Sequence, residues 1–143
     1  FYTRFCEEMT DYYNRPVTSL SMPEFLQALR QCWLTHGWGQ ISLDSNYREQ
    51  GFLVIKVRAS AFIDHAPRLE RPVGFLETGA LQAFFSELSG QPLHCVQTDC
   101  ESLGAEENCF VLGIKERLTM AEAGVEQRLS HAEIMTLLVE QGA

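Results

Sequence analysis

A helical pattern in the middle of the chain, with two strand patterns on each side of it, most constrains the fold. Ser89-Gly90 ends the helical segment, and short polar links join the strand patterns of each pair, which favours hairpins. The sequence therefore predicts an α+β domain, in which an antiparallel sheet of about four strands packs against helices. The strand patterns lie at residues 40–44, 52–57, 93–98 and 108–114. The apolar stripe of the central helix comprises Val73, Leu76, Ala80, Leu81, Phe84, Phe85 and Leu88.

Further helices are expected at both ends of the chain. An amphipathic helix opens the chain and ends at Asn14-Arg15-Pro16, and a capping box at 21–24 begins a second helix that runs to about Thr35. Two more capping-box patterns, at 119–122 and 130–133, each open a helical stretch. We expect residues 1–115 to form the main domain and 116–143 to form a C-terminal helical extension of it. That extension is either a partner surface or a cap on the core.

Composition limits the function classes. A chain of 143 residues with 45% hydrophobic content can bury one sizeable core, so we expect a single domain. The net charge of −8 argues against a nucleic-acid or anionic-membrane partner. No apolar run approaches the length of a bilayer span and no signal segment opens the chain, so direct membrane insertion is not expected. An odd number of cysteines, five, indicates reduced thiols and a cytoplasmic location.

The segment from Gly74 to Phe110 resembles the 4-vinyl-reductase family. A small-residue helix leads into a strand, then Cys100-Glu-Ser-Leu-Gly104, an acidic turn, and Cys109-Phe110 on the returning strand. The turn at 37–39 before a strand is similar as well, and the resemblance extends over about residues 1–115. It implies the fold of transport-particle subunits and haem-type nitric-oxide sensors, commonly dimeric. It also implies a small hydrophobic or aromatic ligand, as in relatives that act as sensory domains or in bacteriochlorophyll synthesis.

The resemblance also implies a possible zinc site. The zinc ligands of the family correspond here to Gly74, Gln97, Cys100 and Cys109, of which glycine offers no donor and a neutral amide is a poor one. Cys100 and Cys109 thus form an incomplete metal site, with Cys95 as a candidate third ligand. The alternative is that both are small apolar residues facing each other across a hairpin. Zinc apart, no cofactor is expected.

Nothing in the sequence indicates an enzyme. The four histidines, at 36, 65, 94 and 131, lie in different elements without a triad order, and His94 and Cys95 are strand neighbours whose side chains diverge. Gly37-Trp38-Gly39 lacks the third glycine and the following helix of a dinucleotide loop. A non-catalytic binding or sensory domain for a small hydrophobic molecule is the favoured function.

Aromatic residues are the candidates for ligand binding. We expect them between the central helix and the sheet, where they form either a pocket or plain core. They are Trp33, Trp38, Phe52, Phe62, Phe75, Phe84, Phe85 and Phe110.

A second hypothesis comes from a weaker resemblance. Residues 38–44, Trp-Gly-Gln-Ile-Ser-Leu-Asp, are similar to a strand of a structural, oligomeric component of the bacterial cellulose synthase complex. That resemblance implies an oligomeric scaffold. Self-association is expected in both cases, as a homodimer for the ligand-binding family and as a higher oligomer for the scaffold.

Overall fold

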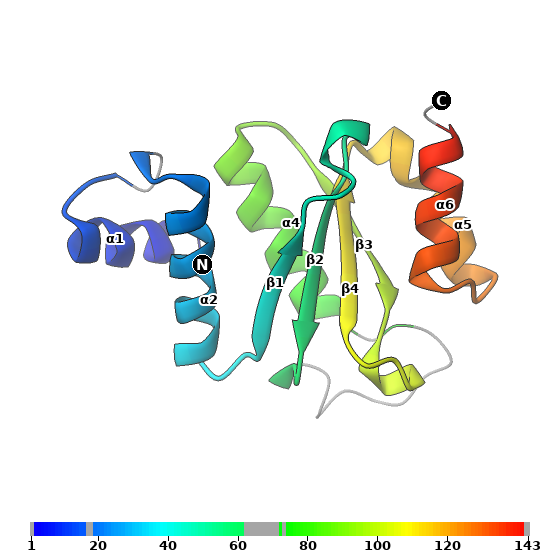
Figure 1. Cartoon of the computed structure of the whole chain (residues 1–143), viewed down its shortest axis with the longest axis horizontal. Helices are drawn as coiled ribbons and strands as arrows, with labels where there is room; N and C mark the ends of the chain where they lie inside the picture. Colours follow the sequence, from blue (N-terminus) through cyan, green and yellow to red (C-terminus); the bar gives the residue numbers. More distant parts are fainter. Residues whose placement is uncertain (1, 17–18, 62–71, 73, 142–143) are drawn as a thin grey trace.

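The computed structural model describes residues 2–16, 19–61, 72 and 74–141, and it confirms the predicted α+β class (Figure 1). The strands are β1 (Gln40–Asp44), β2 (Leu53–Arg58), β3 (His94–Asp99) and β4 (Asn108–Gly113). The α-helices are α1 (Tyr2–Tyr13), α2 (Met22–Thr35), α4 (Phe75–Ser89), α5 (Thr119–Glu126) and α6 (His131–Gln141). Short 3-10 turns are η2 (Arg48–Gln50), η3 (Glu101–Leu103) and η4 (Lys115–Leu118). The loop expected at 64–72 lies, except for Pro72, outside the described residues.

The four strands form one antiparallel sheet in the order β1-β2-β4-β3. Both predicted hairpins are present, and β2 joins them by pairing with β4. Figure 1 shows α4 behind the sheet, α2 beside β1, and α5 and α6 on the side of β3. Successive strand residues point to opposite sides, so the sheet has two buried faces. The α4 face carries Ile41, Ile55, Val57, Cys95, Phe110 and Leu112, and the α6 face carries Val54, Val96 and Val111.

The start of α4 differs from the prediction by one position. Leu76, expected on the apolar stripe, is 76% exposed, and the neighbouring Glu77 is fully buried. The buried side of α4 follows Leu81, Phe84 and Phe85, and a residue four positions before Leu81 falls on the same side of a helix. The stripe therefore includes a carboxylate in its first turn, and Val73 lies outside the described residues.

Two of the three expected capping boxes are confirmed. Ser21 and Glu24 exchange hydrogen bonds at the start of α2, and Ser130 and Glu133 do the same at the start of α6. The prediction at Thr119 is wrong, because η4 runs directly into α5 and Thr119 already has helical dihedral angles. Its hydroxyl donates instead to the Glu116 carbonyl oxygen, and Glu122 pairs with His94.

Ser130 caps a helix and Thr119 does not, although both lie in capping-box patterns, and this difference can be tested. Ser130→Ala should destabilise the fold by about 1 kcal/mol, because the amide N–H of Glu133 loses its capping acceptor. Thr119→Ala is the matched control and should stay within about 0.5 kcal/mol, since Thr119 caps no helix. Urea unfolding of both variants measures the difference. Equal losses would contradict the assignment of the caps.

The C-terminal helices cap the α6 face of the sheet, which was one of the two roles expected for them. Ile134, Met135 and Leu138 of α6 and Ala121 of α5 are buried against Val96 and Val111. None of the helices among the described residues is both long enough and apolar enough to cross a membrane.

Candidate functional site

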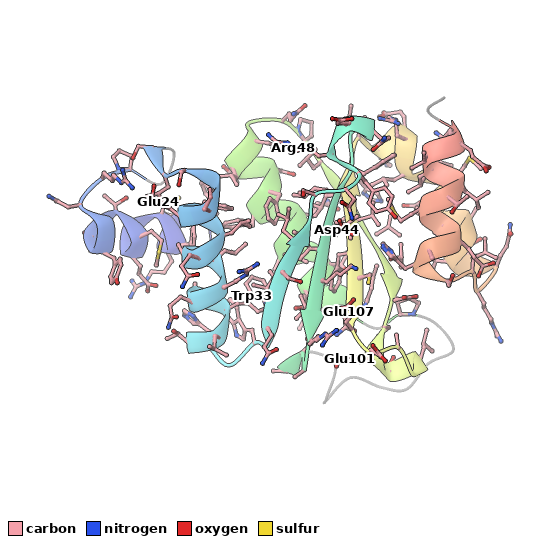
Figure 2. All side chains as sticks on the ribbon, viewed as in Figure 1. Glu24, Trp33, Asp44, Arg48, Glu101 and Glu107 are labelled. Atoms are coloured by element: carbon pink, nitrogen blue, oxygen red, sulfur yellow. The ribbon has the colours of Figure 1, made fainter. Side chains whose placement is uncertain are left out.

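The candidate site is an aromatic layer between the helices and the α4 face of the sheet. Trp33, Phe84, Phe85 and Phe110 are buried in one cluster, and Trp38 packs against its edge. The rings of Trp33 and Trp38 meet edge to face at 5.1 Å between centroids. Figure 2 shows Trp33 reaching from α2 towards the sheet. Five of the eight aromatic candidates are thus brought together.

Aromatic residues from the N-terminal helices complete the layer. Phe84 contacts Phe5 of α1 at 5.2 Å and Phe25 of α2 at 6.1 Å between ring centroids. Phe85 meets Phe84 edge to face at 5.0 Å. The end of the layer around Phe84 is therefore filled by rings, which stabilise one another beyond their burial.

Phe52, Phe62 and Phe75 do not join this group within the described structure. Phe52 packs on the α6 face, in the cluster of Val54 and Val111, and Arg117 lies over its ring at 4.6 Å. Phe52 and Val54 share one side of the chain while Ile55 and Val57 share the other, so strand alternation separates Phe52 from the aromatic layer. Phe62 and the side chain of Phe75 lie outside the described residues.

A buried carboxylate, Glu77, lies at the other end of the layer. The hydroxyl of Ser60 donates to Oε2 of Glu77 at 2.9 Å. Burial raises the pKa of this carboxyl to about 7, and the charge of Glu101 adds to the shift, whereas hydrogen bonding by Ser60 and Trp33 opposes it. Glu77 thus exchanges its proton near neutral pH inside an otherwise apolar layer.

A network of polar side chains holds Ser60 and the start of α4 in place. The carboxylate of Glu101 accepts hydrogen bonds from the backbone N–H groups of Ala59 and Ser60, at 3.0 and 3.1 Å. Asn108, fully buried, donates to the carbonyl oxygen of Val57 and accepts from the N–H of Glu101. The end of β2 is thereby tied to the turn after β3, which sets Ser60 opposite Glu77.

Gln97 extends this network to α4. Its side-chain carbonyl oxygen accepts the N–H of Gly74 at 2.8 Å, and its amide N–H lies 3.4 Å from Oδ1 of Asn108. A Cβ atom at position 74 would meet Oε1 of Gln97 at 2.6 Å, so any side chain there would displace the Gln97 amide. Gly74 and Gln97, the positions that correspond to two zinc ligands, are therefore joined by a hydrogen bond.

The three candidate zinc-binding cysteines do not all point to the same side of the sheet. Cys95 points into the α4 face, whereas Cys109 pairs with Lys56 across the sheet and points to the opposite side. A bulge between Gln97 and Asp99 sets Asp99, not Cys100, opposite Cys109, so Cys100 and Cys109 do not face each other directly across the hairpin. Both thiols are buried. Among the described residues no three His, Cys, Asp or Glu side chains group so that they could hold a metal.

The three described histidines are engaged separately. His36 contacts the carbonyl oxygen of Cys32 through Nδ1 at 2.8 Å, His94 pairs with Glu122 at 2.6 Å, and His131 contacts the hydroxyl of Thr98 at 2.7 Å. Burial lowers the pKa of His131, which favours its neutral form. His36 Nδ1 also lies 3.7 Å from Sγ of Cys32, but burial raises the pKa of this thiol and so disfavours the reactive thiolate.

A separate surface cleft of about 430 Å³ lies between the turn after β3 and the turn that joins α5 to α6. Its described lining includes Thr98, Cys100, Leu103, Leu129 and Ser130. This volume would suit a small ligand. None of the residues predicted to bind an aromatic ligand is among its described lining residues.

The fold is shared with several solved structures of other proteins. The chain is similar to the phenol-responsive sensory domain of the transcription activator PoxR, solved with phenol, with 14% identity, a TM-score of 0.58, and coverage of 89% of this chain and 64% of that chain. Trafficking protein particle complex subunit 3 from Naegleria fowleri, covalently bound to palmitic acid, is similar with 11% identity, a TM-score of 0.53, and coverage of 78% and 72%. At these identities the likeness shows a shared fold.

The family resemblance is confirmed over the middle of the chain. The model of the V4R domain matches residues 53–114, from β2 to the end of β4. A vinyl-4-reductase family protein from Methanocaldococcus jannaschii shares the fold, with 17% identity, a TM-score of 0.52, and coverage of 61% of this chain and 55% of that chain. The chain spans less than two thirds of this protein and of the PoxR domain. No curated protein matches the chain by sequence.

Proposed function

We propose that this chain is a non-catalytic binding or sensory domain for a small hydrophobic or aromatic molecule, held in the aromatic layer. The observation that carries the proposal is a buried carboxylate, Glu77, beside Trp33 in a layer that is otherwise apolar. Ionisable groups with shifted pKa values in such surroundings cluster at functional sites. The V4R match and the fold shared with a phenol-responsive domain support the same function.

Entry of a ligand into this layer requires some rearrangement. Rings fill the end around Phe84, and Glu77 and Trp33 are buried at the other end. A ligand would therefore bind when the packing of α2 and α4 on the sheet opens locally. Such openings are slower than diffusion, so binding should be slower than a diffusion-limited encounter.

Tryptophan fluorescence tests the proposal directly, because both tryptophans of the chain, Trp33 and Trp38, lie in the layer. Titration with phenol and related ring compounds should quench or shift the emission in a saturable way. The same ligands should stabilise the fold, by about 2.7 kcal/mol at a concentration one hundred times Kd. Trp38→Phe should keep most of the response, because Trp33 lies nearer to Glu77.

The surface cleft provides the comparison. Leu129→Arg places a charge among its lining residues and should leave ligand binding unchanged if the aromatic layer is the site. If a ligand binds without changing Trp emission, and Leu129→Arg abolishes that binding, then the site is the surface cleft and not the aromatic layer. The absence of binding across a broad panel of ring compounds would overturn the proposed function.

The state of association belongs to the proposal as well. We propose a homodimer, as the family resemblance implies, and a cytoplasmic location. Native mass spectrometry distinguishes a dimer from the large oligomer that the cellulose-synthase scaffold hypothesis requires, and it also reports retained ligand or metal.

A further inference from the structure

One oxygen of Glu77 has no hydrogen-bond partner of regular geometry among the described residues. The side chain is fully buried, and Oε2 accepts the hydroxyl of Ser60. Hydrogen bonding by the indole of Trp33 also favours the ionised form of Glu77. Its geometry is not that of a regular hydrogen bond, so Oε1 has no regular partner within the described part of the chain. Leaving one oxygen of a buried carboxylate without a regular hydrogen bond is costly, since a lost hydrogen bond to a charged group costs more than one to a neutral group.

The described groups around Glu77 supply no positive charge that could balance it. The charged and titratable groups that influence it are Glu101 of η3, whose negative charge opposes ionisation, and Cys95 of β3. The pKa of Cys95 is raised by burial and by Glu77, so this thiol stays neutral. Ser60, after β2, and Trp33 of α2 contribute neutral donors. The remaining demand of the carboxylate is thus met by a proton or by a donor that is not among the described residues.

We propose that Glu77 determines the specificity of the aromatic layer, and that it selects aromatic molecules that carry a neutral hydrogen-bond donor on the ring, such as a phenolic hydroxyl or an aniline amine. This inference rests on the proposed function and specifies its ligand class. The ring packs among the aromatic side chains, and its donor satisfies Oε1. A hydrogen bond to a charged acceptor is about twice as strong as one between neutral groups.

A neutral donor suits the site better than a cation. Burying an ammonium group beside Glu77 would add its own desolvation cost, which often cancels the attraction of a buried ion pair. A carboxylate ligand such as benzoate would meet Glu77 and Glu101 and should be excluded by like charge. Among ring compounds of the same shape, the presence of a neutral hydrogen-bond donor should therefore determine the affinity.

The preference also couples ligand binding to pH. A donor binds the ionised carboxylate, and with a pKa of about 7 the ionised fraction of Glu77 rises about tenfold between pH 6 and pH 8. Phenol affinity should rise by up to about tenfold over this range, in which phenol itself stays neutral. Toluene offers no donor and favours the protonated carboxyl, so its affinity should fall. Opposite pH slopes for two ligands of equal size are the signature of the proposal.

The experiment compares phenol, toluene, anisole, benzoate and benzylammonium by calorimetric titration of the whole chain at pH 6 and pH 8. At pH 8 phenol should bind at least about tenfold more tightly than toluene and anisole. In Glu77→Leu phenol should bind no better than toluene, and in Glu77→Gln the preference should weaken and lose its pH dependence. The wild-type ligand series needs neither variant, so it decides the matter even where a variant fails to fold.

The outcomes separate this inference from the proposed function. If ring compounds bind with equal affinity whether or not they carry a donor, or with parallel pH slopes, the role of Glu77 is overturned while the binding function stands. If benzoate or benzylammonium binds most tightly, a neutral donor is not what the site selects, and the inference is again overturned. If no ring compound binds at either pH, the proposed function itself fails.

Discussion

Replacing Glu77 by Gln should stabilise the protein by up to roughly 3 kcal/mol at pH 8 and by much less at pH 5. The folded-state pKa of Glu77 is about 7, raised from the ordinary 4.5, so between these values the native chain holds a proton that the unfolded chain has released. The contribution of Glu77 to the stability of the wild type is therefore fully present below about pH 4.5 and is lost as pH rises through 7. Glutamine removes this dependence because it is neutral throughout.

The measurement is urea unfolding at pH 5 and pH 8, followed by tryptophan fluorescence. Glu133→Gln is the matched control, since the capping box at Ser130 lowers the pKa of Glu133 and its contribution is lost as pH falls. The two variants should change the pH profile in opposite directions, with the smaller effect at the exposed Glu133. A Glu77→Gln profile parallel to that of the wild type would show that folding does not raise the pKa of Glu77.

Elements were predictable from the sequence wherever a local pattern decides them. The period of two in 40–44, the helical stripe through Leu81 and the capping box at Ser21 all depend on neighbours in sequence, and each predicted the correct element. Thr119 shows the limit of such motifs. Its pattern matches a capping box, but the preceding turn already places it inside the helix, so its hydroxyl is not available as a cap.

The site was harder to predict, because it depends on which faces meet. Strand alternation separates Phe52 from Ile55, but it does not say which of the two faces α4 will cover. The bulge near Asp99, which sets Cys109 opposite Asp99 instead of Cys100, leaves no clear signal in the sequence. Glu77 had a signal that was missed: it lies four residues before Leu81, on the apolar stripe, where a charge needs an explanation.

The polar network was the least predictable part of the site. Gln97, Glu101 and Asn108 belong to a hairpin, whereas their partners Gly74 and Ser60 lie outside it. Each alone looks like an ordinary polar residue of a strand or turn. Their meaning depends on the tertiary pairing of β2 with β4, which brings Asn108 against Val57.

The hydrophobic core on the α6 face indicates how the C-terminal helices relate to the rest of the chain. We propose that 116–143 folds as part of the same domain, although the V4R match ends at residue 114. The core on the α6 face is built jointly. Val54, Val96 and Val111 come from the strands, and Leu118, Ile134 and Leu138 come from the C-terminal segment. Without the helices the valines would be exposed to water, at a cost of about 25 cal/mol for each Å² of apolar area.

Leu138→Ala should therefore destabilise the whole chain by about 2–5 kcal/mol, because it opens a cavity at a fully buried position. Leu76→Ala is the matched control: the same atoms are removed from an exposed position of α4, and the change should stay within about 0.5 kcal/mol. In one domain, Leu138→Ala lowers a single urea transition, detected equally by tryptophan fluorescence from the aromatic layer and by the loss of helix signal. If α6 instead unfolds separately, while the fluorescence transition keeps the wild-type midpoint, then 116–143 is an independent appendage of the domain.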